Sequence, residues 1–137
     1  MNRIYLVVGA PGSGKTWVCK QLEDKYEYLP HDDFTNDSHY VGSIIRLSRM
    51  TDKPILIETP FSISQIVNPL EKHGFTVTPV FILESPVVTA SRYLNREGRE
   101  IPKGHLTRIE TYKQRAQEYR AFHGTSEAVL SHLRGLV

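Results

Sequence analysis

The chain has 137 residues, 39% of them hydrophobic and 23% charged, and a formal net charge of +2 at pH 7. This composition is typical of a globular domain, and no apolar run approaches the roughly 18 to 20 residues that a membrane-spanning helix needs. We therefore expect one domain, residues 1–137, without a membrane segment. The N-terminus lacks the pattern of a signal peptide, and the one cysteine, Cys19, cannot form an internal disulfide, so we expect a cytoplasmic protein.

The first predicted strand, "RIYLVV", leads directly into the segment "GAPGSGKT", residues 9–16. This segment matches G-x-x-x-x-G-K-[ST], a loop whose backbone N–H groups surround phosphates between a buried strand and a helix. Lys15 is expected to contact the β and γ phosphates of ATP, and the Thr16 hydroxyl to bind Mg²⁺. The residues predicted to bind nucleotide are Gly9, Ala10, Pro11, Gly12, Ser13, Gly14, Lys15 and Thr16.

Further along the chain, apolar strand-like runs alternate with segments of helical periodicity. Strands are predicted in "YEYL", "KPILIE" and "FTVTPVFIL", and helices in the segments that follow each of them. Pro69 predicts a kink or an early end in the second of these helices, and Ser85 and Pro86 predict the start of the third. A long helix is expected from about Leu106 and a last short helix after Gly124. The pattern predicts an α/β fold, a parallel sheet of four to five strands with helices on both faces.

Ligands of such sheets bind at the carboxyl ends of the strands, where several charged residues are predicted to lie. Asp32 and Asp33 follow the second strand, and either could be the base that activates an acceptor hydroxyl, although such a pair is also common as a helix cap. Glu58 ends the third strand and is a candidate for the metal site with Thr16, or an outward ion-paired side chain. Trp17 could pack or face the site, and the sequence does not decide which.

Residues 92–120 carry a local excess of positive charge, which is often only a solvated helix face. Arg92 and Arg96 lie four apart on one predicted helix and are followed by the flexible segment "EGREIP". We expect this region, about 92–103, to be a lid that adds positive charge at the donor phosphates. Lys15 and Arg96 are therefore predicted catalytic residues, with Asp32 or Asp33 as the base. The histidines are too scattered to predict a zinc site, and Cys19 is predicted to lie in the core.

The order of "GAPGSGKT", a strand leading into "HDDF", and "RYLNREGREIP" running into "LTRIETYKQRAQEY" resembles the kinase domain of phage-type polynucleotide 5′-hydroxyl kinases. These belong to the adenylate-kinase-like group of P-loop NTPases. The resemblance covers most of the chain and implies that Asp32 is the general base and that Arg92 and Arg96 contact the donor phosphates. Two positions depart from the family: Thr35 replaces an arginine that holds the acceptor's phosphate, and Glu58 replaces an aspartate.

The resemblance implies transfer of phosphate from ATP to a hydroxyl of nucleic acid, in a bacterial or phage-infected cell. Because Thr35 replaces the arginine, the acceptor is expected to differ from a 5′-hydroxyl beside a 3′-phosphate. A hydroxymethylated base such as 5-hydroxymethyluracil in DNA is compatible, as in small phage kinases that act in DNA modification. The alternatives are a deoxynucleoside monophosphate kinase and an ATPase or NTP-binding protein that transfers phosphate to no acceptor. No G-protein motif of the N-K-x-D type is present.

Overall fold

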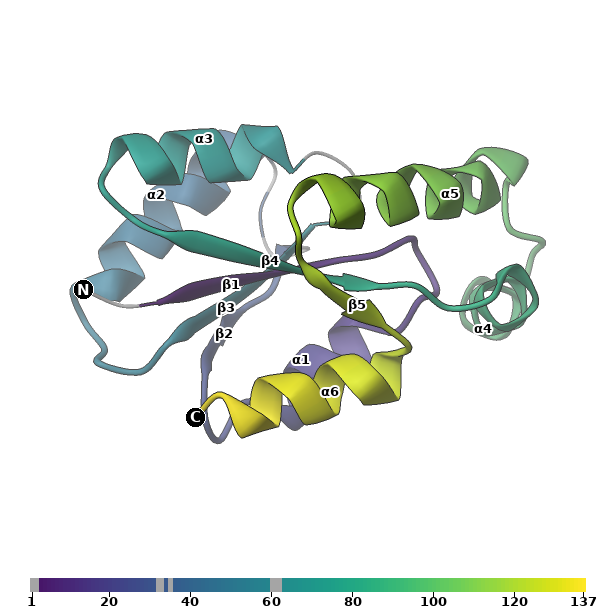
Figure 1. Ribbon diagram of the computed structural model, residues 1–137, viewed down its shortest axis with the longest axis horizontal. Coiled ribbons are helices and arrows are strands. Elements are labelled where there is room, and N and C mark those ends of the chain that lie inside the picture. Colours follow the sequence, from purple (N-terminus) through teal and green to yellow (C-terminus); the bar gives the residue numbers. More distant parts are fainter. Residues whose placement is uncertain (1–2, 32–33, 35, 60–62) are drawn as a thin grey trace.

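The computed structural model describes residues 3–31, 34, 36–59 and 63–137. Within these ranges, strands and helices alternate along most of the chain (Figure 1). In chain order the elements are β1 (Ile4–Val8), α1 (Lys15–Gln21), β2 (Glu27–Leu29), α2 (Asp37–Ser48), β3 (Ile55–Thr59), α3 (Ser64–Lys72), β4 (Val77–Ile82), α4 (Pro86–Glu97), α5 (Lys103–Glu118), β5 (Phe122–Gly124) and α6 (Ser126–Gly135).

The described strands form one parallel sheet in the order β2-β3-β1-β4-β5. Strand β1 is central, and Ile4 pairs with Ile55 of β3 on one side and with Val77 of β4 on the other. All carboxyl ends therefore lie at the same edge of the sheet, where the loops into α1, α2, α3 and α4 begin. The predicted parallel α/β sheet is confirmed.

Helices cover both faces of the sheet because alternate residues of its buried strands point in opposite directions. Ile4, Leu6 and Val8 of β1 pack in a cluster with α2, α3 and α5, whereas Tyr5 and Val7 pack in a cluster with α1 and α6. The two helical layers lie above and below the sheet in Figure 1. All five residues of β1 are consequently buried, so the strand shows no polar alternation in the sequence.

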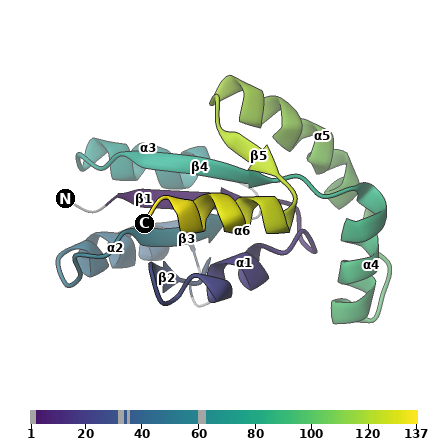
Figure 2. The ribbon, with the colours of Figure 1, turned by 60° about the horizontal axis from the view of Figure 1, so that its bottom comes forward.

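Helix α4 lies apart from these layers, beyond the end of the sheet at which β4 leads into it (Figure 2). It begins as predicted: the Ser85 side chain accepts a hydrogen bond of 3.2 Å from Val88 N, and Pro86 occupies the first turn. It ends at Gly98, which has φ 71° and closes the helix with a hydrogen bond from its N–H to Leu94 O. This position sets α4 beside the phosphate-binding loop.

Three elements differ from the sequence-based expectation. Helix α3 continues past Pro69 to Lys72, because its apolar face, Ile66, Val67 and Leu70, is buried and compensates for the missing N–H of proline. Helix α5 begins at Lys103, earlier than expected. Strand β5 was not predicted, since three residues are too short for a periodic pattern. Among the described residues, no helix is both long and apolar enough to cross a membrane.

Candidate active site

The loop between β1 and α1 has the backbone geometry of an anion-binding turn. Gly12 and Gly14 have φ angles of 86° and 102°, a region that residues with a Cβ rarely adopt. A hydrogen bond of 3.0 Å from Ser13 N to Ala10 O closes the loop over itself. Because Gly14 is also the N-cap of α1, the first N–H groups of that helix follow directly from the loop.

The neighbouring helices pack tightly against this loop. A Cβ atom on Gly12 would lie 2.7 Å from the Thr89 carbonyl oxygen of α4, and one on Gly14 would lie 3.1 Å from Arg92 Nη1 and from Ser126 Cβ. The glycines are therefore required for close packing as well as for their backbone angles. Helices α4 and α6 together hold the loop from outside.

Lys15 lies over the loop, with its Nζ atom donating to Gly9 O at 2.7 Å and to Ala10 O at 3.2 Å. Ser13 Oγ is buried and has no hydrogen-bond partner within the described part of the chain. A cationic side chain, a buried hydroxyl with unmet bonding capacity and a glycine turn whose N–H groups can converge are together suited to a phosphate group. The donor set fits the triphosphate of ATP.

Glu58 is the second-last residue of β3 and is buried, at 3% exposure, in register with Val7 of β1. Its Oε1 atom accepts a hydrogen bond of 2.8 Å from the Tyr28 hydroxyl. Burial, followed by the charges of Cys19 and Glu58, raises the pKa of Tyr28, so this hydroxyl keeps its proton and remains a donor. Because Glu58 is buried, the alternative of an outward side chain is wrong.

The same carboxylate lies within electrostatic range of α1. Burial, then the charge of Glu58, raises the pKa of the Cys19 thiol, whereas Lys15 lowers it. Cys19 is fully buried, as predicted, and is a core residue. Among the described residues no three His, Cys, Asp or Glu side chains form a metal-binding group. A Mg²⁺ ion here would take ligands from phosphates and water as well as from Thr16 and Glu58, as Mg²⁺ usually does.

A hollow of about 200 Å³ lies between the phosphate-binding loop and α4. The residues that line it are Gly12, Gly14, Lys15, Thr16, Trp17, Arg92 and Arg96. All of them except Trp17 were predicted nucleotide-binding residues. Trp17 lines this hollow and has 46% of its surface exposed, so it is not a core residue.

Arg92 and Arg96, the two arginines of α4 that line this hollow, have different surroundings. Arg92 Nη1 donates to Ser13 O at 2.9 Å and lies 3.4 Å from both Glu84 Oε1 and Ser126 Oγ. Arg96 is more exposed, and its Nε atom donates to Glu97 Oε1 at 2.9 Å. Arg92 is therefore attached to the phosphate-binding loop, whereas Arg96 lies on the rim of the hollow.

Glu84 links β4, α4 and α6 at this point. Its side chain is 8% exposed, and its Oε1 atom accepts hydrogen bonds from Ser126 N at 2.8 Å and from Ser126 Oγ at 2.9 Å. Neither Glu84 nor Ser126 was among the site residues predicted from the sequence. Glu84 directly follows the predicted strand at residues 75–83, so the rule that ligands gather at carboxyl ends could have found it.

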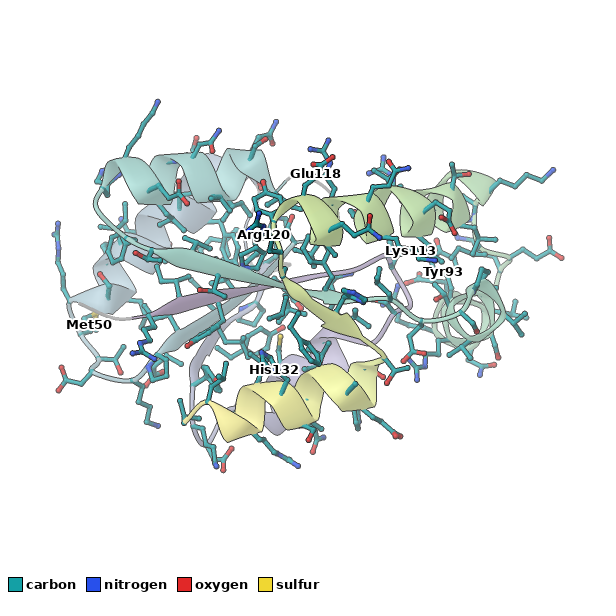
Figure 3. The ribbon with its side chains drawn as sticks, in the orientation of Figure 1. Met50, Tyr93, Lys113, Glu118, Arg120 and His132 are labelled. Atoms are coloured by element: carbon teal, nitrogen blue, oxygen red, sulfur yellow. The ribbon has the colours of Figure 1, made fainter. Side chains whose placement is uncertain are left out.

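Tyr93, labelled in Figure 3, lies between α4 and α5. Its ring is 5.7 Å from the ring of His105, and the guanidinium groups of Arg96 and Arg99 lie 5.7 and 5.8 Å from its centroid. The pKa of His105 is lowered by burial first, and then by the positive charges of Arg108, Arg99 and Lys15. Positively charged side chains thus gather around Tyr93 and His105, namely Arg96, Arg99, Arg108 and Lys15.

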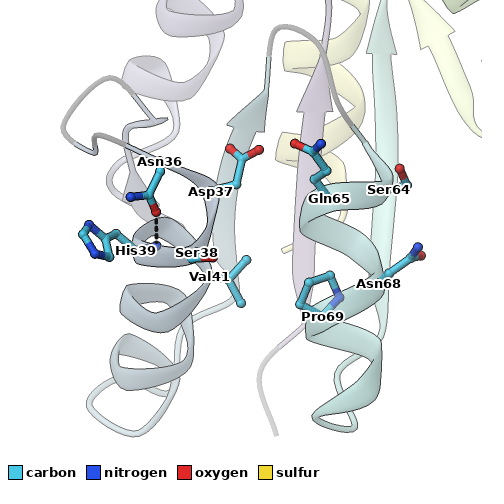
Figure 4. Close-up of a pocket in the computed structure, with 9 residues that line it drawn as sticks. All are labelled: Asn36, Asp37, Ser38, His39, Val41, Ser64, Gln65, Asn68 and Pro69. Atoms are coloured by element: carbon cyan, nitrogen blue, oxygen red, sulfur yellow. Dashed lines mark hydrogen bonds between the residues drawn. The ribbon is translucent and has the colours of Figure 1, made fainter.

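The predicted base, Asp32, and its neighbour Asp33 lie outside the described residues, as does Thr35. Directly before them, His31 Nε2 lies 3.0 Å from Asp37 Oδ1. Asp37 is the first residue of α2, and it lines a hollow of about 790 Å³ between the starts of α2 and α3 (Figure 4). This third aspartate after β2 was not among the predicted site residues.

The large hollow has a polar, mostly uncharged lining. Its residues are Asn36, Asp37, Ser38, His39 and Val41 from the α2 side and Ser64, Gln65, Asn68 and Pro69 from α3. Asn36 also caps α2, with its side-chain oxygen accepting from His39 N at 2.9 Å. No lysine or arginine is found among these lining residues. Hydroxyl, amide and carboxylate groups are suited to bind a ligand through its own hydroxyl and amide groups.

The sequence matches no protein-family model and no curated protein. The structure is similar to the Deinococcus radiodurans tunicamycin resistance protein, with a TM-score of 0.64 and 15% identity over 99% of this chain and 95% of that one. It is also similar to a gluconokinase from Sinorhizobium meliloti 1021, with a TM-score of 0.63 and 22% identity over 96% and 93% of the two chains. The chain has the P-loop NTPase fold.

A third structure with this P-loop fold is a deoxyadenosine kinase from M. mycoides with bound dATP, at a TM-score of 0.51 and 12% identity over 90% of this chain and 91% of that one. Identities of 12 to 22% establish the fold and leave the acceptor open. The chemistry of this P-loop protein must therefore be argued from its own residues.

Proposed function

We propose that the protein is an ATP-dependent kinase that transfers the γ-phosphate to a hydroxyl of nucleic acid, either a 5′-hydroxyl end or a hydroxymethylated base such as 5-hydroxymethyluracil in DNA. The observation that carries the proposal is the pair of hollows at one edge of the sheet. The first hollow lies beside the glycine loop and Lys15, and the second is a polar hollow of about 790 Å³ at the starts of α2 and α3. Phosphoryl transfer requires both a donor site and an acceptor site, and two hollows at the same edge of the sheet are suited to these roles.

The chain's own groups supply the remaining roles. Lys15 and the loop N–H groups hold the donor phosphates, and Arg92 and Arg96 add positive charge from the lid, about 92–103. Thr16 and Glu58 would hold Mg²⁺, which neutralises and orients the phosphates when bound. Asp32 accepts the proton of the acceptor hydroxyl as its oxygen bonds to the γ-phosphorus and the bond to the ADP oxygen breaks. In this proposal residues 1–137 act as one kinase domain.

The described lining of the acceptor hollow contains the carboxylate of Asp37 and no lysine or arginine, which supports a hydroxyl-bearing base or sugar over a phosphate as the group bound there. A deoxynucleoside monophosphate kinase must neutralise the acceptor's phosphate beside the transferred one, and the described lining offers no lysine or arginine for that purpose. An ATPase would need only a water molecule and no hollow of about 790 Å³. We therefore rank both alternatives below the nucleic-acid kinase.

The test is transfer of label from γ-³²P-ATP to three acceptors: a 5′-hydroxyl oligonucleotide, DNA containing 5-hydroxymethyluracil, and deoxynucleoside monophosphates. Label on either polymer is the expected result. Label only on monophosphates, or release only as free phosphate, would contradict the nucleic-acid assignment. Lys15→Ala should abolish transfer in every case.

Three aspartate variants identify the base. Asp32→Asn is expected to lower kcat by roughly 10²- to 10⁴-fold while ATP binding is retained, which is the usual contribution of a general base. Asp33→Asn and Asp37→Asn are the matched controls: Asp33→Asn should keep most of the activity, and Asp37→Asn, whose residue lines the acceptor hollow, should keep kcat while raising the KM for the acceptor. Loss of transfer only in one of these controls would assign the base role to that residue.

A further inference from the structure

A second hollow, of about 270 Å³, lies between the start of α3 and helix α5. Its lining is Ile63, Ser64, Arg108, Thr111, Tyr112, Arg115 and Tyr119. Arg108 and Arg115 are seven residues apart, close to two helical turns, so they lie on the same face of α5. The hollow therefore presents two guanidinium groups, two hydroxyls and two phenols, a set of hydrogen-bond donors suited to an oxyanion.

Arg108, one of the two arginines that line this hollow, is held in place by a residue of the core, Tyr112. Tyr112 is 4% exposed and packs near Phe81, with ring centroids 6.5 Å apart. Burial raises the pKa of Tyr112, and a hydrogen bond with Arg108 and the charge of that arginine act in the opposite direction. Arg108 is thus held by a buried phenol. On the exposed side of the helix, Arg115 Nη1 forms a weaker ion pair with Glu118 Oε2, at 3.8 Å.

This hollow adjoins the acceptor hollow. Ser64, the first residue of α3, lines both of them. The acceptor hollow has no arginine or lysine in its described lining, whereas the adjoining one has two. If the base or sugar of a nucleotide occupied the acceptor hollow, its phosphate would lie near Ser64 and the arginines of α5.

We propose that Arg108 and Arg115 form a phosphate-binding subsite for the acceptor, next to the hollow that binds its reacting part. The inference rests on the proposed function, since it assumes that the α2–α3 hollow receives the acceptor. It offers a nucleotide acceptor a phosphate contact in a chain where, by the resemblance to polynucleotide 5′-hydroxyl kinases, Thr35 replaces a phosphate-binding arginine. The phosphate proposed for this subsite is a phosphodiester of a DNA acceptor, and binding of a mononucleotide phosphate instead is an outcome of the test.

The test uses Arg108→Gln, Arg115→Gln and the double variant in the full chain. Lys113→Gln is the matched control, because Lys113 lies on the same helix, is exposed, and lines neither hollow. Thermal unfolding of each variant checks that it is folded. Binding of a fluorescein-labelled single-stranded DNA oligonucleotide is measured by anisotropy without ATP, and a deoxynucleoside monophosphate and inorganic phosphate serve as competitors.

We expect each arginine variant to weaken oligonucleotide binding by at least tenfold and the double variant by more, with Lys113→Gln within threefold of the unchanged protein. For the polymer, the slope of log K against log salt should become shallower by about 0.7 for each DNA phosphate that a variant no longer binds. Competition by the monophosphate at low concentration would identify the mononucleotide as the source. An equal weakening in Lys113→Gln, unchanged binding in the arginine variants, or no binding of any of the three ligands would overturn the subsite.

Steady-state kinetics separate this inference from the proposed function. If both hold, the arginine variants raise the KM for the acceptor while the KM for ATP and kcat change little. Arginine-dependent binding without any label transfer would support the subsite and contradict the kinase. Label transfer with an unchanged acceptor KM in the double variant would support the kinase and overturn the subsite.

Discussion

Arg92 donates a hydrogen bond of 2.9 Å to the carbonyl oxygen of Ser13, 79 residues earlier in the chain. Through the same nitrogen it contacts Glu84 and Ser126, so one side chain joins the phosphate-binding loop, the end of β4 and the start of α6. Arg92 therefore shapes the loop before any nucleotide is bound. Arg96, which has no such attachment in the described residues, is better placed to move toward the donor phosphates.

This difference between the two arginines is testable with single alanine variants. Arg92→Ala should raise the KM for ATP by about ten- to a hundredfold and lower the melting temperature, because charged hydrogen bonds contribute roughly 1.5–3 kcal/mol each. Arg96→Ala should lower kcat with little change in melting temperature. Arg134→Ala, which removes an exposed charge from α6, is the control for both. A melting temperature unchanged in Arg92→Ala would show that its hydrogen bonds do not support the loop.

Glu84 is predicted to act as the acceptor that holds Arg92 and Ser126 together. Glu84→Ala leaves the buried Ser126 N–H and hydroxyl without their acceptor, and should destabilise the protein by about 1–3 kcal/mol. Glu84→Gln keeps an acceptor oxygen and should retain most of the stability. Chemical denaturation of the three proteins measures the difference. Equal stability of the alanine and glutamine variants would argue against this role.

Gly12→Ala tests the packing of α4 on the loop. The substitution places a Cβ 2.7 Å from Thr89 O at a φ of 86°, a backbone region that costs roughly 1–2 kcal/mol for a residue with a side chain. We expect ATP binding to be abolished in isothermal titration calorimetry. Gly104→Ala in α5, where no atom lies within 4 Å of the new Cβ, should bind ATP normally and gain about 0.5–1 kcal/mol of stability.

Trp17 should report nucleotide binding through its fluorescence, because it is the only tryptophan and its partly exposed ring lines the hollow beside Lys15. Addition of ATP is expected to change its emission intensity with a saturable dependence on concentration. The change should disappear in Lys15→Ala. Constant emission in a sample for which calorimetry detects ATP binding would show that the indole ring does not face the nucleotide.

The pKa of His105 should rise when nucleotide binds. Its pKa is lowered from 6.5 by burial and by Arg108, Arg99 and Lys15, so the folded state favours the neutral imidazole. Because the folded pKa lies below the unfolded one, this residue costs stability as the pH falls below about 6.5. Bound triphosphate would offset the charge of Lys15 and raise the pKa of His105 toward its ordinary value. NMR titration of the imidazole with and without a non-hydrolysable ATP analogue measures this shift, with His73 as the distant reference.

Some parts of the fold were predictable because their causes are local. The glycine loop, the buried strand before it and the Ser85–Pro86 helix start depend on residues within a few positions of one another, and all are present in the structure. Strand β5 and the passage of α3 through Pro69 depend on partners distant in sequence. Pairing with β4 defines the first, and burial of an apolar face on the sheet maintains the second.

The candidate site divides in the same way. The sequence by itself determined a phosphate-binding loop at the carboxyl edge of a parallel sheet. Backbone conformation in the loop and burial of the strand depend on residues within a few positions of one another, so short motifs are enough to predict them. Only the tertiary structure decided that Arg92 binds the loop through Ser13 and that Glu84 and Ser126 complete this contact. It also decided that Ser64 lines both the acceptor hollow and the adjoining hollow with the arginines of α5. Side-chain partners and cavity linings come from elements far apart in the chain, so no local pattern encodes them.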